Sequence, residues 1–242
     1  VERNATASQC VENSDVVFTM LSTQEAIEEV ALGQVGFLNA MKAGSTWVDC
    51  STVSPSFSKH CCEEAAKKGI QFVEAPVAGS TGTAAAGQLV FLVGGVKSTV
   101  EPLIPLLNLM GKKVMHVGAV GSASATKLLI NYALASAMIN FSEIVKAGRG
   151  IGLSDDFLFD QLPNFPVMAP FVQLKATKIR NADYSPEFPL EWMVKDINLL
   201  EQTLEKSSQT LPMLKLLRST YREGIKKGQS REDFSSVIKV LS

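Results

Sequence analysis

Short apolar segments alternate with helical patterns through the first half of this chain. The segments are rich in β-branched and aromatic residues and are predicted to be strands: 15–21, 46–50, 70–74, 89–93 and 113–117. Helical patterns over 24–42, 55–68 and 99–110 lie between them. Such alternation is typical of an α/β fold with a parallel or mixed sheet and crossover helices.

The strand patterns stop near Gly118, and the remainder is predicted to be helical over 124–150, 155–162, 170–180, 191–207, 212–227 and 232–241. Ser230 and Asp233 have the spacing of a capping box at the start of the last helix. We therefore expect an α/β domain over 1–118 and an all-helical domain over 119–242. The polar segment 1–15 is interpreted as a surface segment that leads into the first strand.

Composition and charge exclude several classes of protein. The 242 residues carry a net charge of −1 and no long basic run, so we expect no nucleic-acid partner. The nearly uncharged helical stretch 128–142 is shorter than the ~20 residues of a membrane span, so we expect no membrane association. The cysteines and histidines show no metal-ligand spacing, and small packing residues in a reducing compartment explain the cysteines. We expect a cytoplasmic protein, or one of an organellar matrix if the source is eukaryotic.

The segment 118–131 places two polar groups on one face of an otherwise apolar helix. A turn that contains glycine leads into this helix, in which Lys127 and Asn131 lie four residues apart. Lys127 could extend its ammonium from a partly buried helix end while Asn131 bonds locally. Alternatively, both side chains face a ligand, and the spacing alone leaves the two interpretations open.

Small and polar residues follow the predicted strands at 21–23, 51–54 and 76–83, where ligands bind in sheets of this class. The glycines of the last loop allow backbone N–H groups to converge on an anion, although a plain surface turn explains them equally well. Hydroxyl groups in the loop 51–54 suit a ligand or a helix cap. On residue type alone, Lys195 and Asp196 are a solvated charge pair and Phe188 is a core residue.

In this order and spacing, these segments resemble the β-hydroxyacid dehydrogenase family, which includes 3-hydroxyisobutyrate dehydrogenases. The matching motifs are DCSTVSP at 49–55, EAPVAGSTG at 74–82, GQLVFLVGG at 87–95, GAVGSASATKLLIN at 118–131 and KD at 195–196. FSE at 141–143, YSPEFPL at 184–190 and DFSSVI at 233–238 are similar to the branch that reduces glyoxylate and succinic semialdehyde. The resemblance implies a Rossmann-type domain followed by an all-helical domain, with the active site between them.

The resemblance also implies roles for individual residues. Lys127 is implied as the catalytic general acid and base. The implied substrate-binding residues are Thr52, Gly79, Ser80, Asn131, Phe188 and Asp196. The implied cofactor contacts are Leu21, Ser22, Thr52 and Lys195. No metal is implied.

The implied reaction is hydride transfer between NAD or NADP, with NADPH favoured, and a small carboxylate-bearing substrate. Glyoxylate, succinic semialdehyde and 3-hydroxyisobutyrate represent the substrate type. A lysine ammonium can stabilise the charge that grows on a carbonyl oxygen and can supply the proton. The apolar helical half also favours a homodimer or homotetramer, because large exposed apolar patches usually find partners.

Two departures from the family pattern keep alternatives open. Ala78 stands where the family usually has serine in its carboxylate loop, which puts the usual substrate in doubt. No GxGxxG motif occurs, so we expect an incomplete Rossmann-type domain and a sequence that is part of a longer protein. The alternative is a catalytically inactive member that serves as a binding or scaffold module. A 6-phosphogluconate-type enzyme is a third possibility, but it requires basic phosphate-binding residues that the sequence does not identify.

Overall fold

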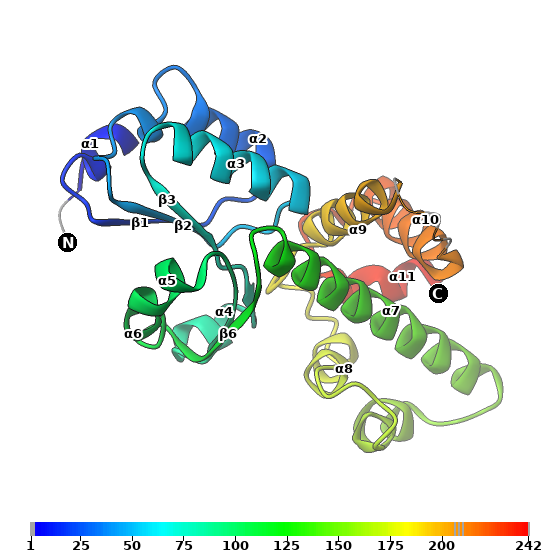
Figure 1. The fold of residues 1–242 in the computed structure, drawn as a ribbon. Coiled ribbons are helices and arrows are strands. Elements are labelled where there is room, and N and C mark those ends of the chain that lie inside the picture. The colour runs from blue at the N-terminus through cyan, green and yellow to red at the C-terminus, as the bar shows by residue number, and fades with distance from the viewer. Residues whose placement is uncertain (1–2, 206, 208, 210, 242) are drawn as a thin grey trace. The chain divides into compact units, whose positions relative to one another are not determined.

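The computed structural model of this protein describes residues 3–205, 207, 209 and 211–241. It divides into two compact units, the first unit (Val1–Leu128) and the second unit (Leu129–Ser242). The helix α7 (Ser122–Gly150) starts in the first unit and continues through the boundary into the second (Figure 1).

A six-stranded mixed sheet forms the centre of the first unit, in the order β1-β2-β3-β5-β4 with β6 also paired to β5. Its strands are β1 (Val16–Thr19), β2 (Thr46–Asp49), β3 (Gln71–Glu74), β4 (Val77–Ala78), β5 (Leu89–Gly94) and β6 (Gly111–Gly118). The neighbours β1, β2 and β3 are parallel, as are β5 and β6, whereas β3 and β4 pair antiparallel with β5. The predicted α/β class is therefore confirmed, with a mixed sheet.

Helices cover both faces of this sheet. Successive side chains of a strand point to opposite faces, so each buried strand contributes residues to two cores. Trp47 of β2 belongs to the core beneath α3 (Pro55–Lys67), where its ring lies 5.4 Å from Phe37 and 4.9 Å from Phe72. The next residue, Val48, belongs to the other core, which α5 (Lys97–Val100) and α6 (Ile104–Leu107) complete. Figure 1 shows α2 and α3 on one side of the strands and α5 and α6 on the other.

The helix predicted over 24–42 is wrong beyond its first two turns. The segment begins as α2 (Gln24–Ile27), continues as a π-helical turn η1 (Glu28–Leu32) and ends at Gly33. A short 3₁₀ helix, η2 (Phe37–Asn39), follows Gly36. A side chain at Gly36 would place its Cβ 2.4 Å from the Ala31 carbonyl oxygen, so the chain turns where only glycine fits.

Proline divides the helix predicted over 99–110 into shorter pieces. Pro102 lies near the start of the 3₁₀ helix η3 (Glu101–Leu103), and Pro105 lies near the start of α6. Proline has no backbone N–H and is accepted mainly in a first helical turn, which explains why each proline is the second residue of its piece.

Short elements also occur where the sequence predicts only loops. The segment 1–15 contains α1 (Ala7–Val11), which Thr6 caps by accepting from the Gln9 N–H, and the loop 76–83 contains β4 and the start of α4 (Thr81–Ala85). These elements have at most five residues, too few for a periodic pattern to show.

The described part of the second unit contains helices and no strand. After α7 these are η4 (Phe157–Gln161), η5 (Leu162–Asn164), α8 (Val172–Arg180), α9 (Leu190–Leu204), α10 (Pro212–Lys226), η6 (Phe234–Val237) and α11 (Ile238–Leu241). Asp233 itself caps η6 by accepting from the Ser235 N–H at 3.2 Å, so the capping box predicted for Ser230 and Asp233 is wrong. The order of an α/β domain and then a helical domain is as predicted.

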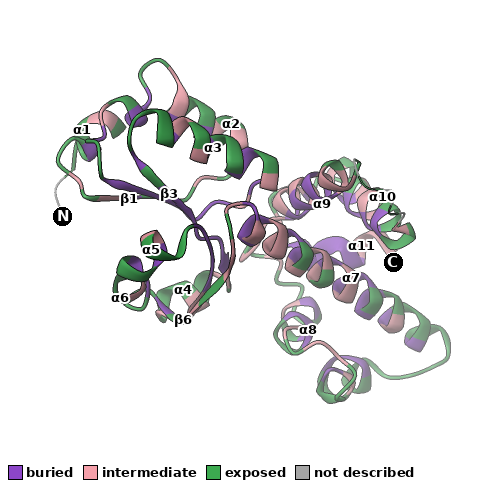
Figure 2. Cartoon of the chain, in the orientation of Figure 1, coloured by how far each residue is buried: buried purple, intermediate pink, exposed green. Residues whose placement is uncertain are grey.

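The helix α7 has 29 residues and passes the length and composition test for a membrane span. The sequence predicted this helix over 124–150 and counted only 128–142 as nearly uncharged, and the absence of membrane association stays a prediction. Of its most apolar 18 residues, 44% are buried within the fold, and a core helix of a globular protein passes the same test. Figure 2 shows buried and exposed residues interleaved along α7.

Candidate active site

A buried hydrogen bond joins two predicted substrate-binding residues of the second unit. The Asn131 Nδ2 on α7 donates to the Asp196 Oδ2 on α9 over 2.5 Å, across 65 residues of sequence. The Lys195 Nζ lies 3.2 Å from the other carboxylate oxygen of Asp196. Asn131 is 1% exposed and Asp196 3% exposed, so Lys195 and Asp196 are not the solvated pair that residue type alone allows. The structure thus brings Asn131, Lys195 and Asp196 together.

Lys127 lies one turn before Asn131 on the same helix. It belongs to the first unit and its side chain is half-buried. Residues four apart share one face of a helix, so α7 carries a cationic and an amide group on one side, as the spacing predicts.

Phe188 is held through its backbone. Its N–H donates to the Asp233 Oδ2 at 3.2 Å, and its carbonyl oxygen accepts from the Phe234 N–H at 2.8 Å. The Phe188 and Phe234 ring centroids lie 5.8 Å apart. Phe188 therefore has a defined place beside η6 and is half-buried, whereas residue type alone suggested a plain core position.

The sequence did not indicate that Asp233, which binds the Phe188 N–H, forms an ion pair with Lys175. Lys175 on α8 is buried and donates to Asp233 at 2.9 Å and to Glu187 at 3.0 Å. Burial of Asp233 raises its pKa, but hydrogen bonds from Ser235 and the Lys175 ammonium outweigh this and hold the pKa below its ordinary value. One sequence signal was present: Lys175 lies between Val172 and Ile179 on the apolar face of α8, where a cation requires a buried carboxylate.

The loops beyond the carboxyl ends of β1 and β2 are fastened to each other. The Leu21 N–H donates to the Ser51 Oγ at 2.9 Å, and the Ser51 Oγ donates to the Asp49 Oδ1 at 2.6 Å. The Thr19 Oγ1 donates to the same Asp49 oxygen at 2.8 Å. Burial raises the pKa of the Asp49 carboxyl, although these hydrogen bonds oppose the shift. The network fixes the loops that carry Leu21, Ser22 and Thr52.

The loop after β4 has a backbone that suits only glycine at one position. Gly79 has φ of +138°, and a Cβ there would lie 2.9 Å from side-chain atoms of both Leu89 and Thr83. Ser80 directly precedes α4, and Ala78 pairs with Val90 of β5. The structure thus places Gly79 and Ser80 at the end of a short strand in the first unit, and their contact with a carboxylate remains a prediction.

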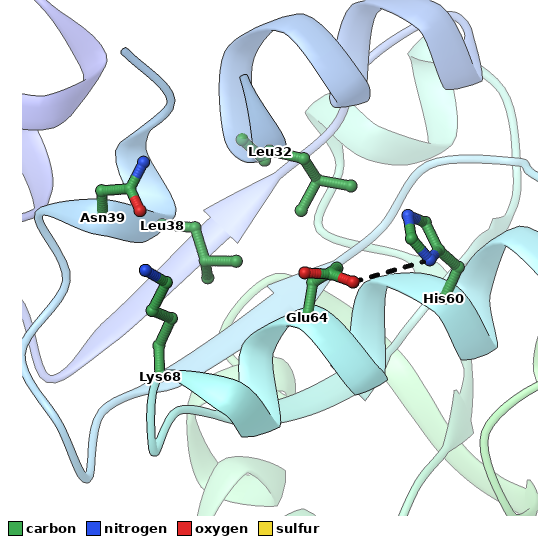
Figure 3. A pocket seen from close by; sticks show the side chains of 7 residues that line it. Leu32, Leu38, Asn39, His60, Glu64 and Lys68 are labelled. Atoms are coloured by element: carbon green, nitrogen blue, oxygen red, sulfur yellow. Dashed lines mark ion pairs between the residues drawn. The ribbon is translucent and has the colours of Figure 1, made fainter. Parts of the chain in front are cut away.

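A surface hollow of about 340 Å³ lies elsewhere in the first unit, between η1, η2 and α3. Figure 3 shows Leu32, Leu38, Asn39 and Lys68 around it, with the His60 Nδ1 4.0 Å from Glu64. No predicted site residue lines it. In the described ranges, no group of three His, Cys, Asp or Glu side chains could hold a metal ion.

Two family models match consecutive parts of the chain. One, described as the NAD binding domain of 6-phosphogluconate dehydrogenase, matches residues 1–118. The other, described as NAD-binding of NADP-dependent 3-hydroxyisobutyrate dehydrogenase, matches residues 121–241. The chain belongs to the β-hydroxyacid dehydrogenase family.

Individual members of the β-hydroxyacid dehydrogenase family agree with these matches. The chain is 34% identical over 227 residues to the glyoxylate/succinic semialdehyde reductase 2, chloroplastic, of Arabidopsis thaliana, covering 94% of this chain and 63% of that protein. It is 34% identical over 242 residues to the human 3-hydroxyisobutyrate dehydrogenase, mitochondrial, covering 95% of this chain and 70% of that protein. The chain thus spans less than two thirds of the Arabidopsis relative.

A solved structure shows the same fold. The 3-hydroxyisobutyrate dehydrogenase of Mycobacterium tuberculosis, determined with L-serine, superposes with a TM-score of 0.87 at 29% identity, covering 98% of this chain and 83% of that one. The predicted family, its class of NAD(P)-dependent dehydrogenases and the Rossmann-type fold followed by helices are therefore confirmed. The relatives are named for small hydroxy and oxo acids, and the roles of individual residues stay predictions.

The first unit of this β-hydroxyacid dehydrogenase fits one end of a nicotinamide cofactor. Dinucleotides bind outside the carboxyl ends of parallel strands, where β1 and β2 end in the fastened loops described above. Met20, directly after β1, is 65% exposed and offers an apolar surface next to Leu21 in the sequence. The loops fit a cofactor because they combine fixed backbone, hydroxyl groups and an accessible apolar side chain.

Proposed function

We propose that this β-hydroxyacid dehydrogenase interconverts a small hydroxy acid and the corresponding aldehyde acid, with NADP or NAD and a preference for NADPH. Glyoxylate, succinic semialdehyde and 3-hydroxyisobutyrate represent the substrate type. The observation that carries this proposal is the buried hydrogen bond between Asn131 and Asp196, beside Lys195. A buried amide and carboxylate on an apolar helix pair are expensive to desolvate, and recognition of a polar substrate is a reason to retain them.

Lys127 acts in this proposal as the general acid of the reduction. Its ammonium stabilises the negative charge on the carbonyl oxygen and then donates a proton to that oxygen. In the oxidation, the neutral amine accepts the hydroxyl proton. When bound, the reduced nicotinamide supplies the hydride for the carbonyl carbon.

The remaining residues hold the reactants in this proposal. Asn131 and Asp196 orient the reacting carbon, Phe188 and Thr52 line the substrate site, and the loop with Gly79 and Ser80 binds the substrate carboxylate. The cofactor contacts are Leu21, Ser22, Thr52 and Lys195. Residues 1–118 thus serve the nucleotide, and residues 119–242 serve the substrate and a homodimer or homotetramer. A cytoplasmic or organellar matrix location suits this chemistry.

Substitution of Lys127 in the complete gene product tests the proposal. Lys127→Ala removes the proton donor but keeps the helix, because alanine is the best helix former. Proton transfer by a positioned group contributes roughly 10²–10⁴-fold, so kcat for succinic semialdehyde falls at least about a hundredfold. Affinity for NADPH stays within a few-fold, and Lys127→Arg restores little activity because arginine keeps its proton at neutral pH.

The matched control is Lys97→Ala, which removes an exposed lysine of the same unit. It leaves kcat at the parental value. Retention of more than about a tenth of kcat by Lys127→Ala, with chemistry rate-limiting, would refute the catalytic role. A complete protein that binds no dinucleotide and reduces none of the substrates would instead be the binding or scaffold module.

A further inference from the structure

A carboxylate from the sheet holds the first turn of α7. Glu74, the last residue of β3, is 1% exposed. Its Oε1 accepts from the N–H groups of Gly121 and Ala123, each at 2.7 Å. Its Oε2 accepts from the hydroxyls of Ser124 at 2.5 Å and Ser58 at 2.6 Å.

These hydrogen bonds satisfy donors that the helix cannot satisfy itself. The first N–H groups of an α-helix have no partner within the helix, and its N-terminus attracts negative charge. Helices usually meet this need with a polar side chain at the N-cap, directly before the first turn. Here the carboxylate comes from 47 to 50 residues earlier in the sequence, so the start of α7 is tied to the end of β3.

The sheet is built to admit this carboxylate. Gly94 of β5 lies opposite Glu74 in the antiparallel pair. A Cβ at Gly94 would lie 2.3 Å from the Glu74 Oε1 and 2.9 Å from its Cγ, so only glycine leaves the space. Ser58 reaches the carboxylate from α3 and is fully buried. Three elements besides β3 therefore converge on one anionic group.

We propose that Glu74 is a positioning residue for Lys127, a role that rests on the function proposed above. Ser124, which Glu74 binds through both its hydroxyl and its N–H, lies one turn before Lys127 on α7. Glu74 also directly precedes the segment that leads through β4 to Gly79 and Ser80. One buried carboxylate thus sets both the helix that carries the proton donor and the start of the loop proposed for the substrate carboxylate.

Kinetics of Glu74→Ala in the complete gene product test this role. A displacement of about 1 Å at a reacting group can cost roughly a hundredfold in rate, so kcat falls by about 10- to 100-fold. The KM for NADPH stays within about threefold, because Leu21 and Ser22 are fixed through Ser51 and Asp49 instead. The assay runs well below the melting temperature of Glu74→Ala, so that the parent and the variant are both folded.

A stability-matched control separates positioning from general damage. Phe72 lies on the same strand in the core beneath α3, and Phe72→Leu or Phe72→Ala is chosen to match the melting temperature of Glu74→Ala. The control keeps the parental kcat. Ser124→Ala, which keeps a strong helix former in the first turn, lowers kcat in the same direction as Glu74→Ala and serves if Glu74→Ala does not fold.

A double-mutant cycle with Lys127→Ala shows whether Glu74 acts through Lys127. If it does, Glu74→Ala has little further effect on the residual kcat of Lys127→Ala, whereas independent structural damage multiplies the two losses. Equal turnover by Glu74→Ala and the Phe72 control, or losses that multiply, would overturn the inference. If Lys127→Ala itself turned over like the parent, the proposed function would fail first, and the two failures are distinguishable.

Discussion

Asp233 makes the stability of the second unit depend on pH. Its pKa is below the ordinary value in the folded protein, so its stabilising contribution is full above the unfolded pKa of about 3.9 and is lost as the pH falls through the folded pKa. We expect Asp233→Asn to cost about 1.5–3 kcal/mol at pH 7, because it removes the fully buried one of the two carboxylates that bind Lys175 and leaves only the partly exposed Glu187.

Urea unfolding of the parent and of Asp233→Asn from pH 7 to pH 2 measures this dependence. The difference in the free energy of unfolding narrows below about pH 4, where the parent also loses the charge. Glu205→Gln, an exposed substitution in the same unit, is the control and follows the parent throughout. If the difference in the free energy of unfolding stayed constant from pH 7 to pH 2, the charge of Asp233 would not contribute to stability.

The candidate residues could be predicted to different degrees. Motif resemblance pointed to Asn131, Lys195 and Asp196, which the structure brings together in the second unit. Glu74 and Asp233 could not be assigned their contacts, because each depends on partners about 50 residues away that no local pattern specifies. The partners of such a buried charge are set by how distant segments fold together, whereas an amphipathic pattern can be recognised from residues that are neighbours in the sequence.

The two-residue strand β4 gives the loop proposed for the substrate carboxylate a defined side chain to test. Ala78 is half-buried and pairs with Val90, so Ala78→Ser adds a hydroxyl without changing the backbone. A neutral hydrogen bond contributes about 0.5–1.5 kcal/mol, so kcat/KM for carboxylate-bearing substrates rises roughly 2- to 12-fold. Assays with glyoxylate, succinic semialdehyde and 3-hydroxyisobutyrate measure it. No gain with any of them would argue against a carboxylate at this loop.

Among the elements, long buried strands and long helices were predictable and interrupted ones were not. The strand at 46–50 and the helix from Pro55 have strong local signals, namely a β-branched apolar run and a Ser-Pro helix start. The helix predicted over 24–42 failed because apolar periodicity continues past Gly33, where the backbone leaves the helical conformation. The glycines at 33 and 36 marked where the helix could end. Whether it does end there depends on the packing of the backbone around Ala31, which the sequence pattern does not reveal.

At the scale of the whole molecule, α7 is a single helix that contributes residues to both units. Ala123 and Leu128 belong to the first unit, Ala135 and Met138 belong to the second, and all four are buried. Loss of the helix therefore removes apolar contacts from both units. We expect both units to unfold in one transition.

The two tryptophans allow this to be measured, since Trp47 lies in the first unit and Trp192 in the second. Trp47→Phe and Trp192→Phe each leave one fluorescent reporter. Within each variant, we expect urea unfolding followed by the fluorescence of its remaining tryptophan and by far-UV circular dichroism to have the same midpoint. Separate midpoints within a single variant would mean that α7 does not couple the units.

The tie between Glu74 and α7 also sets an order of events during synthesis. A nascent chain that ends at Gly118 already contains every described strand of the sheet, but the N–H groups that bind Glu74 begin at Gly121, directly before α7. Burying a carboxylate with Ser58 as its one remaining donor is costly, so we expect the core around β3 to close only after those groups have left the ribosome. Domains generally fold as units in the order of synthesis, and we expect the first unit to complete its core only after the opening turn of α7, which is its own last segment, has been made.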